Sequence, residues 1–233
     1  GYNALMSLTS GANNIAIGVD ALGGTWDSTT DTSDYNIAIG HGAMAIALND
    51  ASNNVGIGNQ ALAGIQTADN NTAVGFNAGF AIGSGSDNVC IGYIAGDSIT
   101  TAGKTVFIGS ASGQAVTVTG GSNVSDGTVG IGYQALTALT TGGSNVAIGY
   151  QAGLAMTDNG GNVIIGYDAF KLADSGEGAN VVIGKEAGKN INTSTSDNNV
   201  IIGKDAGTGG AASMTNCVLL GESAMNNTGT NAQ

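Results

Sequence analysis

The chain of 233 residues contains no proline and no arginine, and its five lysines are outnumbered by 17 acidic residues. Charged residues make up 9% of the chain, well below the quarter that is typical of globular proteins. The formal net charge of −12 excludes the clustered basic surface that binding to a phosphate backbone requires. We therefore expect no nucleic-acid partner, and we expect the acidic groups to serve solubility.

Aromatic side chains and cysteines are also scarce. Aromatic residues make up 5% of the chain, and the two cysteines are Cys90 and Cys217. In the repeat pattern described next they lie seven repeats apart. Seven stacked coils that rise about 4.8 Å each would separate them by about 34 Å, which excludes a disulfide between them. No stretch approaches the length of a transmembrane span, so we expect no membrane insertion.

What the chain does have is glycine, 41 residues of it, and one repeated phrase. The clearest copy reads Asn-Val-Ala-Ile-Gly-Tyr-Gln-Ala, at Asn145–Ala152. Its glycine recurs every 17 to 23 residues, at Gly1, Gly18, Gly40, Gly58, Gly75, Gly92, Gly109, Gly132, Gly149, Gly166, Gly184, Gly203 and Gly221. Such a period predicts an all-β repetitive solenoid or β-roll of about 12 coils, each one repeat long.

This solenoid fills residues 1–233 as a single domain. The chain begins at the glycine of the repeat, without an initiator methionine and without the strand that precedes that glycine in other copies. We therefore expect it to be a fragment of a longer polypeptide.

The residues before the repeated glycine predict a short strand. Aliphatic residues stand one and three positions before it, mostly Ile and Val, as in Val146 and Ile148. We expect these two columns to form the inner wall of the coil. The column between them, from Ala16 to Leu219, contains no polar residue, although in/out alternation would turn it toward water. We therefore predict that another chain covers this column and that the protein is a parallel homo-oligomer.

Two further columns point to structure. Asn stands four positions before the glycine in nine repeats, which predicts a hydrogen-bonded ladder of amides along the stack. Ala stands three positions after the glycine in nearly every repeat, and large apolar residues such as Ile65 and Ile82 stand seven after it. The latter spacing fits either a second short strand or a single helical turn.

The residue directly after the repeated glycine is aromatic in six repeats, and five of the six tyrosines occupy this column. A row of exposed rings is a platform for sugar faces. The rings can equally stack on one another for stability alone, as equal residues do in solenoids. The candidate glycan-binding residues are Phe76, Tyr93, Tyr133, Tyr150 and Tyr167.

Two loops are longer than the rest, from Thr25 to Tyr35 and from Val116 to Gly127. Insertions of this kind display binding residues on solenoids. The candidates in the first loop are Trp26, Asp27, Asp31 and Asp34. Its carboxylates are ligands of the type that Ca²⁺ prefers, but the full pattern of a calcium-binding motif is absent. We predict no metal site and no cofactor, and we interpret Lys185, Lys189 and Lys204 as part of a solvated face.

The phrase Asn-x-Val-Ala-Ile-Gly-x-x-Ala resembles the head repeats of trimeric autotransporter adhesins. It resembles even more the Asn- and Gly-rich repeats of phage tail-fibre proteins, and Gly1–Leu5, Asn53–Leu62 and Asn145–Gly153 carry the likeness best. The resemblance implies a parallel homotrimer that is borne on a virion or exposed at a cell surface and is adhesive. The chain departs from the adhesin heads in its longer repeat and in lacking their neck motif and heptad stalk, which favours the fibre.

The resemblance implies a structural and receptor-binding segment of a phage tail fibre. Such a segment is a rigid trimeric shaft, joined to flanking fibre domains, that presents a surface for a host polysaccharide or protein receptor. The head domain of a bacterial surface adhesin is the alternative. A third candidate, a left-handed β-helix acyltransferase, needs a hexapeptide three times per coil and a catalytic histidine. Here one third of each repeat fits, and His41 is the single histidine. No catalytic set forms around it, so we expect no enzyme.

Overall fold

The computed structural model of the chain describes residues 1–6, 11–24, 32–46, 48–117, 126–209 and 213–225. Within these residues it contains short strands and turns, and no helix. The strands, of three residues each, are β1 (Ile15–Ile17), β2 (Ile37–Ile39), β3 (Val55–Ile57), β4 (Thr72–Val74), β5 (Val89–Ile91), β6 (Val106–Ile108), β7 (Val129–Ile131), β8 (Val146–Ile148), β9 (Val163–Ile165), β10 (Val181–Ile183), β11 (Val200–Ile202) and β12 (Val218–Leu220). The all-β fold class is confirmed.

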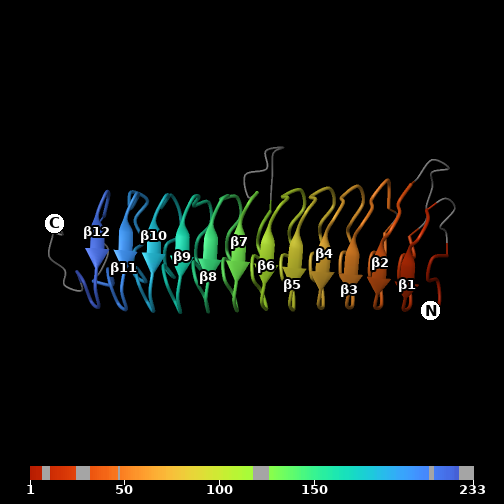
Figure 1. Cartoon of the computed structure of the whole chain (residues 1–233), viewed down its shortest axis with the longest axis horizontal. Coiled ribbons are helices and arrows are strands. Elements are labelled where there is room, and N and C mark those ends of the chain that lie inside the picture. Colours follow the sequence, from red (N-terminus) through yellow and green to blue (C-terminus); the bar gives the residue numbers. More distant parts are fainter. Residues whose placement is uncertain (7–10, 25–31, 47, 118–125, 210–212, 226–233) are drawn as a thin grey trace.

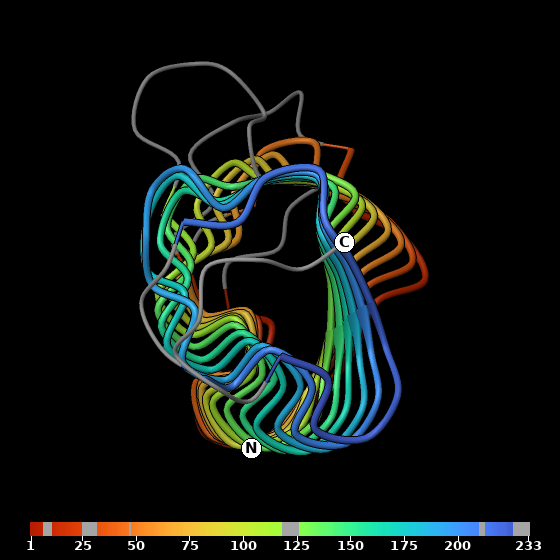
Figure 2. The same ribbon diagram turned by 90° about the vertical axis from the view of Figure 1, so that its left-hand side faces the viewer.

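The strands form one parallel sheet in sequence order, each hydrogen-bonded to the next. Equal positions of the repeat are paired, for example Val146 with Val163 and Ile148 with Ile165. Figure 1 shows the strands side by side along the long axis, with β1 and β12 at opposite ends. Viewed along that axis, the coils lie over one another (Figure 2). Each repeat is therefore one coil, and the molecule is a β-solenoid.

The orientation of the strands corrects one prediction. The middle residue of each strand, and not its two neighbours, faces the inside of the coil: Ala147, Ile164 and Val182 are fully buried. The Val and Ile columns that we expected on the inner wall face outward, and Ile148 remains 37% exposed. The covering chain that we inferred for the middle column is therefore not needed there, because the coil itself buries it.

Packing inside the coil explains this orientation. The interior is narrow, and large side chains fill it, from the turns (Met44) or from the middle of a strand (Phe107), beside smaller middle residues in neighbouring coils. A Cβ added to Gly56 would lie 3.2 Å from Met44 Cε, and one added to Gly130 would lie 2.9 Å from Phe107 Cδ1. Two bulky β-branched columns would not fit in this space. Because all three columns are apolar, hydrophobicity alone could not tell the inner face from the outer one.

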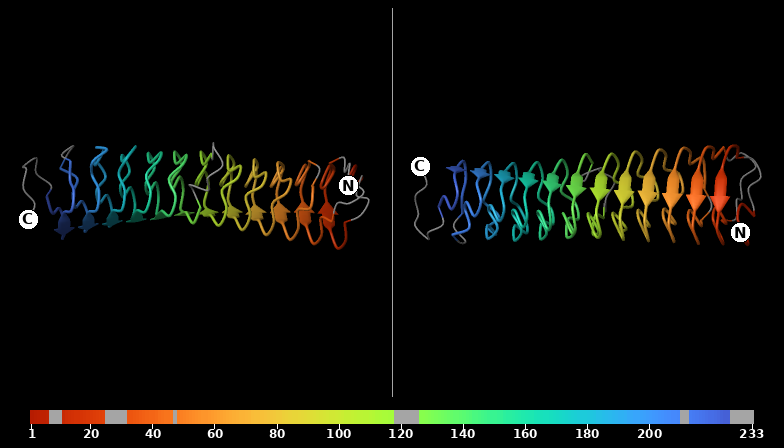
Figure 3. Two further views of the ribbon diagram at one scale, coloured as in Figure 1. Left: turned by 90° about the horizontal axis from the view of Figure 1, so that it is seen from above. Right: turned by 60° about the horizontal axis from the view of Figure 1, so that its bottom comes forward.

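The segment after the glycine is neither a second strand nor a helical turn. It is a run of turns in which two residues have left-handed backbone conformations, for example Gln60 (φ 54°) and Leu62 (φ 52°). Their backbone N–H groups bond to neighbouring coils on opposite sides: Gln60 donates to His41 O (2.9 Å) and Leu62 donates to Ala78 O (3.0 Å). The turns thus tie each coil to both neighbours; in Figure 3 the strands occupy one side of the solenoid and the remainder of each coil the others.

The predicted asparagine ladder is present and buried. Asn71 donates both its backbone N–H (2.9 Å) and its side-chain amide (3.1 Å) to Asn54 Oδ1. Asn54 donates in the same way to Asn36 Oδ1, at 3.0 and 3.1 Å. The amide of Asn54 also donates to Ala68 O in the loop of the next coil (2.8 Å). One asparagine side chain therefore forms hydrogen bonds with polar groups of two coils in the interior. The recurrence of Asn at this position thus has a structural explanation.

Candidate functional site

The aromatic column forms stacked rows on the surface. The ring centroids of Tyr133 and Tyr150 are 5.3 Å apart with an interplanar angle of 16°, and those of Tyr150 and Tyr167 are 4.9 Å apart at 8°. Phe76 and Tyr93 form a second stack, with centroids 5.4 Å apart. The repeated glycine places each ring at the same point of its coil, so the coil spacing sets the stacking distance. Most ring faces are therefore covered by neighbouring rings.

The rows still offer surface to a ligand. Tyr150, which has a ring on each side, is 41% exposed, whereas Tyr93, which has one stacked neighbour, is 55% exposed. The exposed parts are the ring edges along each row and the faces at the row ends. Sugar binding along the whole row would need a continuous series of open ring faces. The stacking does not provide one, because neighbouring rings cover each other.

Lysines follow the aromatic row and are held in ion pairs. Lys185 Nζ lies 5.9 Å from the ring centroid of Tyr167, which is within cation–π range, and 3.6 Å from Glu186. Lys189 pairs with both Glu186 (3.2 Å) and Asp168 (3.4 Å). Lys204 pairs with Glu222 at 3.0 Å. These cations are neutralised within the stack, which agrees with our interpretation of them as a solvated face.

Of the four candidate residues in the first long loop, the structure describes Asp34, while Trp26, Asp27 and Asp31 lie outside the described residues. The backbone N–H of Asp34 donates to Ser52 Oγ (3.0 Å), and its carboxylate accepts from the N–H of Ala12 (2.5 Å). Asp34 is thus part of the hydrogen bonding between coils. Most of the second long loop, residues 118–125, also lies outside the described part of the chain.

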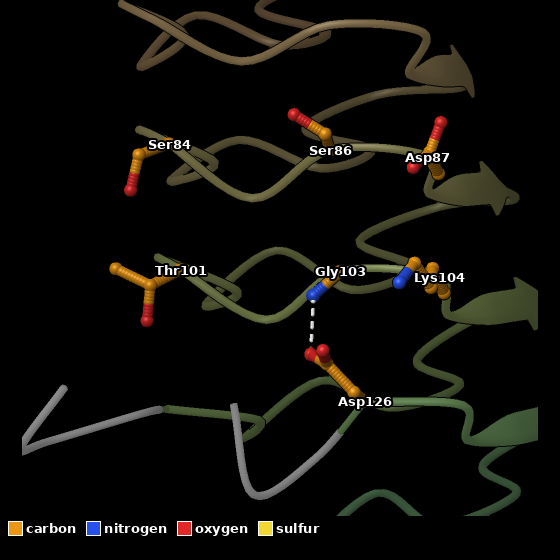
Figure 4. A pocket seen from close by; sticks show the side chains of 7 residues that line it. All are labelled: Ser84, Ser86, Asp87, Thr101, Gly103, Lys104 and Asp126. Carbon is orange, nitrogen blue, oxygen red and sulfur yellow. Dashed lines mark hydrogen bonds between the residues drawn. The ribbon is translucent and has the colours of Figure 1, made fainter. Parts of the chain in front are cut away.

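One surface depression among the described residues spans three coils. Its volume is about 340 Å³, and its lining residues are Ser84, Ser86, Asp87, Thr101, Gly103, Lys104 and Asp126. In Figure 4, Asp126 reaches across to the coil of Gly103, whose N–H donates to its carboxylate at 2.7 Å. Asp87 accepts from the amide of Asn70 at 3.1 Å. Both carboxylates that line the depression, those of Asp87 and Asp126, thus accept hydrogen bonds from other coils. The columns did not predict this hollow, because its residues differ from coil to coil.

A buried carboxyl group lies beneath the surface at Glu177. Its side chain is fully buried, and Oε2 accepts from the amide of Asn159 at 2.6 Å. Within the described residues, Oε1 has no hydrogen-bond partner. Burial raises the pKa of Glu177, and the nearby charge of Asp174 acts in the same direction. The negative form of this carboxyl group is therefore poorly accommodated in the folded chain.

We expect Glu177→Gln to stabilise the protein at neutral pH. Because the folded-state pKa lies above the unfolded value, the folded chain binds the proton more tightly, and stability falls as pH rises through this interval. The neutral amide of glutamine avoids this loss. At pH 8 the free energy of unfolding of the variant should therefore exceed that of the wild type by about 1 kcal/mol. At pH 4, where the native carboxyl group is protonated, the two proteins should be equally stable. Urea denaturation at both pH values measures this. A difference that is the same at pH 4 and pH 8 would contradict it.

The remaining reactive groups do not assemble into a site. Cys90 is a free, buried thiol whose pKa is raised to about 12 by burial, and Cys217 is also free. His41 is exposed in the column of the aromatic residues. Among the described residues, no three His, Cys, Asp or Glu side chains are grouped as metal ligands. The described part of the chain also has no helix with the length and apolar character needed to cross a bilayer.

Comparison of the chain with protein-family models, with curated protein sequences and with solved structures found no match. The functional assignment therefore rests on the geometry of the solenoid and on the resemblance of its repeated phrase.

Proposed function

We propose that this chain is a rigid segment of a phage tail fibre, assembled as a parallel homotrimer, that presents a binding surface to host-surface glycan. The observation that carries the proposal is the outer face of the sheet. Of the 24 outward positions in the strands, one is polar, Thr72, and none is charged. A water-facing sheet would alternate apolar and polar residues, so this face has the composition of an interface.

The dimensions of this face suit assembly along its length. Twelve strands at about 4.8 Å spacing extend over about 53 Å, and three residues span about 10 Å, so the strip covers about 500 Å². That is at the upper end of what monomeric proteins expose as one apolar patch. It runs along the long axis as one row of strands (Figure 1), so parallel copies can bury it coil by coil. The trimer number comes from the family resemblance.

An elongated body supports the role of a shaft. Strands β1 and β12 lie at opposite ends, so domains attached beyond them would be held about one solenoid length apart (Figure 1). The head domain of a bacterial surface adhesin would have the same architecture on a bacterial cell in place of a virion, and this function remains the second candidate. An acyltransferase is less well supported, since each described coil has one strand, whereas a left-handed β-helix enzyme needs three.

Sedimentation of the purified chain tests the proposal. We expect a mass three times that of the 22.6 kDa chain at micromolar concentration. The double variant Ile148→Lys/Ile165→Lys places charges on the outer face of β8 and β9 and should weaken self-association at least tenfold, because the charges would be desolvated in the interface. A wild-type monomer, or a double variant that remains as trimeric as the wild type, would refute the outer face as the interface.

A matched control uses the same two coils. Ala155→Lys/Leu172→Lys adds the same charge six positions after the repeated glycine, in the turns that lie away from the sheet. Both side chains are partly or well exposed, with Leu172 at 43%. We expect this control to assemble like the wild type. Loss of assembly in both variants would point to general charge repulsion and away from a specific face.

A further inference from the structure

The aromatic row has one interruption between Phe76 and Tyr167. In successive coils the residue after the repeated glycine is Phe76, Tyr93, Ser110, Tyr133 and Tyr150. Rings stack on both sides of the interruption, Phe76 with Tyr93 and Tyr133 with Tyr150. Ser110 supplies a hydroxymethyl group where each neighbour supplies a ring. One rung of the row is therefore missing.

The coils do not spread apart at this point, so the missing rung leaves a slot of defined width. Strands β5, β6 and β7 remain paired in register. The turns beside the row also keep their bonds, from Ala111 N–H to Tyr93 O (2.9 Å) and from Gln134 N–H to Ser110 O (2.9 Å). Tyr93 and Tyr133 are thus two coil steps apart, about 10 Å, which exceeds the range of about 4.5–7 Å for direct ring stacking.

A slot two steps wide accepts one ring. Elsewhere in the row a ring that occupies its step lies 4.9–5.4 Å from each neighbour. A guest ring midway between Tyr93 and Tyr133 would lie about 5 Å from both, within the range of favourable ring contacts. Both walls are more exposed than a tyrosine flanked on both sides: Tyr93 is 55% and Tyr133 46% exposed, against 41% for Tyr150.

We propose that the slot formed by Tyr93, Ser110 and Tyr133 binds one neutral pyranose ring, which completes the aromatic row. This proposal rests on the proposed function and specifies its site. A pyranose carries C–H groups on both faces, which pack against the two tyrosine rings, and hydroxyl groups at its rim. The Ser110 hydroxyl is available to one of these, and the remainder stay in water. No lysine lies in this stretch of the column and the chain carries a charge of −12, which disfavours anionic sugars.

Filling the slot with protein provides the test. Ser110→Tyr supplies the missing rung in a column that already holds tyrosine in the following three coils, so the fold should accept it. Saturation-transfer NMR with the methyl glycosides of glucose, galactose and N-acetylglucosamine measures binding to the assembled wild-type chain. We expect transfer from at least one glycoside to the wild type and at least a tenfold loss of affinity in Ser110→Tyr.

The control is Lys185→Tyr, which adds a ring at the far end of the row, next to Tyr167, and leaves the slot open. It should bind like the wild type. Should Ser110→Tyr fail to fold, Tyr93→Ala removes one wall and should show the same loss. No transfer to folded wild type, equal binding by wild type and Ser110→Tyr, or binding of indole but of no glycoside would each overturn the proposal.

The failure of the slot is distinguishable from the failure of the fibre assignment. Sedimentation reports the assembly without any ligand. A trimer that binds none of the three glycosides leaves the shaft intact and removes the slot. A monomer whose glycoside binding is abolished by Ser110→Tyr keeps the slot and removes the trimeric shaft.

Discussion

Gly149→Ala should lower the stability of the solenoid by about 4 kcal/mol, the largest effect that we expect from one methyl group. Gly149 has φ 140°, a conformation that L residues rarely adopt. A Cβ at this position would lie 2.3 Å from the carbonyl oxygen of Gly166 in the next coil. The opposing group is backbone, so relief requires the coils to separate and weakens the bond from Gly166 N–H to Ile148 O (2.8 Å). Strain and overpacking each contribute about 1–3 kcal/mol.

Urea denaturation followed by circular dichroism measures this loss, and hydrogen exchange locates it. Because each coil contacts only its neighbours, we expect faster exchange chiefly around β8 and β9. Gly83→Ala is the matched control, since its Cβ would lie 3.7 Å from Thr100 O, an ordinary contact, and its backbone is not left-handed. That variant should stay within about 0.5 kcal/mol of the wild type. Equal losses at Gly149 and Gly83 would show that the close approach between coils is not the cause.

Those features that depend on stacking equal residues could be predicted from the sequence. The period of the glycine predicted the coils, because the contact seen at Gly149 recurs at each repeated glycine from Gly1 to Gly203 and excludes a Cβ there. The Asn column predicted the buried ladder, because an amide both donates and accepts and so propagates through identical neighbours. The aromatic column predicted rings at coil spacing, and stacking on one another was one of its two interpretations.

Other features had no sequence signal that physical reasoning could use. The inner and outer faces of the strands were exchanged in our prediction because Ala147 and its apolar neighbours Val146 and Ile148 differ in size and not in polarity. Packing in the narrow coil decides this, and it depends on how large side chains such as Met44, in a turn, and Phe107, in the middle of β6, fill the interior. The turns escaped prediction because left-handed φ values fall on Gln60 and Leu62, which do not favour that conformation by themselves.

Correcting the orientation changes which residues carry the prediction of assembly. The middle column, from which we inferred a covering chain, is satisfied within the coil. The apolar face for which we propose a partner is the outer one, along Val146, Ile148 and their equivalents. The slot at Ser110 also follows from the stack, because an omission becomes a site only when its neighbours are held at fixed spacing. Both functional proposals are therefore consequences of strict stacking.

The second large effect should come from the asparagine ladder. We expect Asn162→Ala to cost about 3 kcal/mol. Asn162 Oδ1 accepts the backbone N–H (2.9 Å) and the side-chain amide (3.2 Å) of Asn180, and its own amide donates to Glu177 O (3.0 Å). Alanine leaves these groups in the interior without their partner, and each such group costs about 1–3 kcal/mol. The drop in the urea midpoint measures the loss.

Asn162→Thr is the informative comparison, since the chain itself places Thr105 at the equivalent position. There the threonine hydroxyl and backbone N–H both donate to Asn88 Oδ1, at 2.7 and 3.0 Å. Threonine at position 162 should therefore keep the contact to Asn145 and lose part of the contact to Asn180, for about half the cost of alanine. If alanine and threonine destabilise equally, the hydrogen bonds of the ladder are not what holds the coils together there, and side-chain volume at this position is the cause.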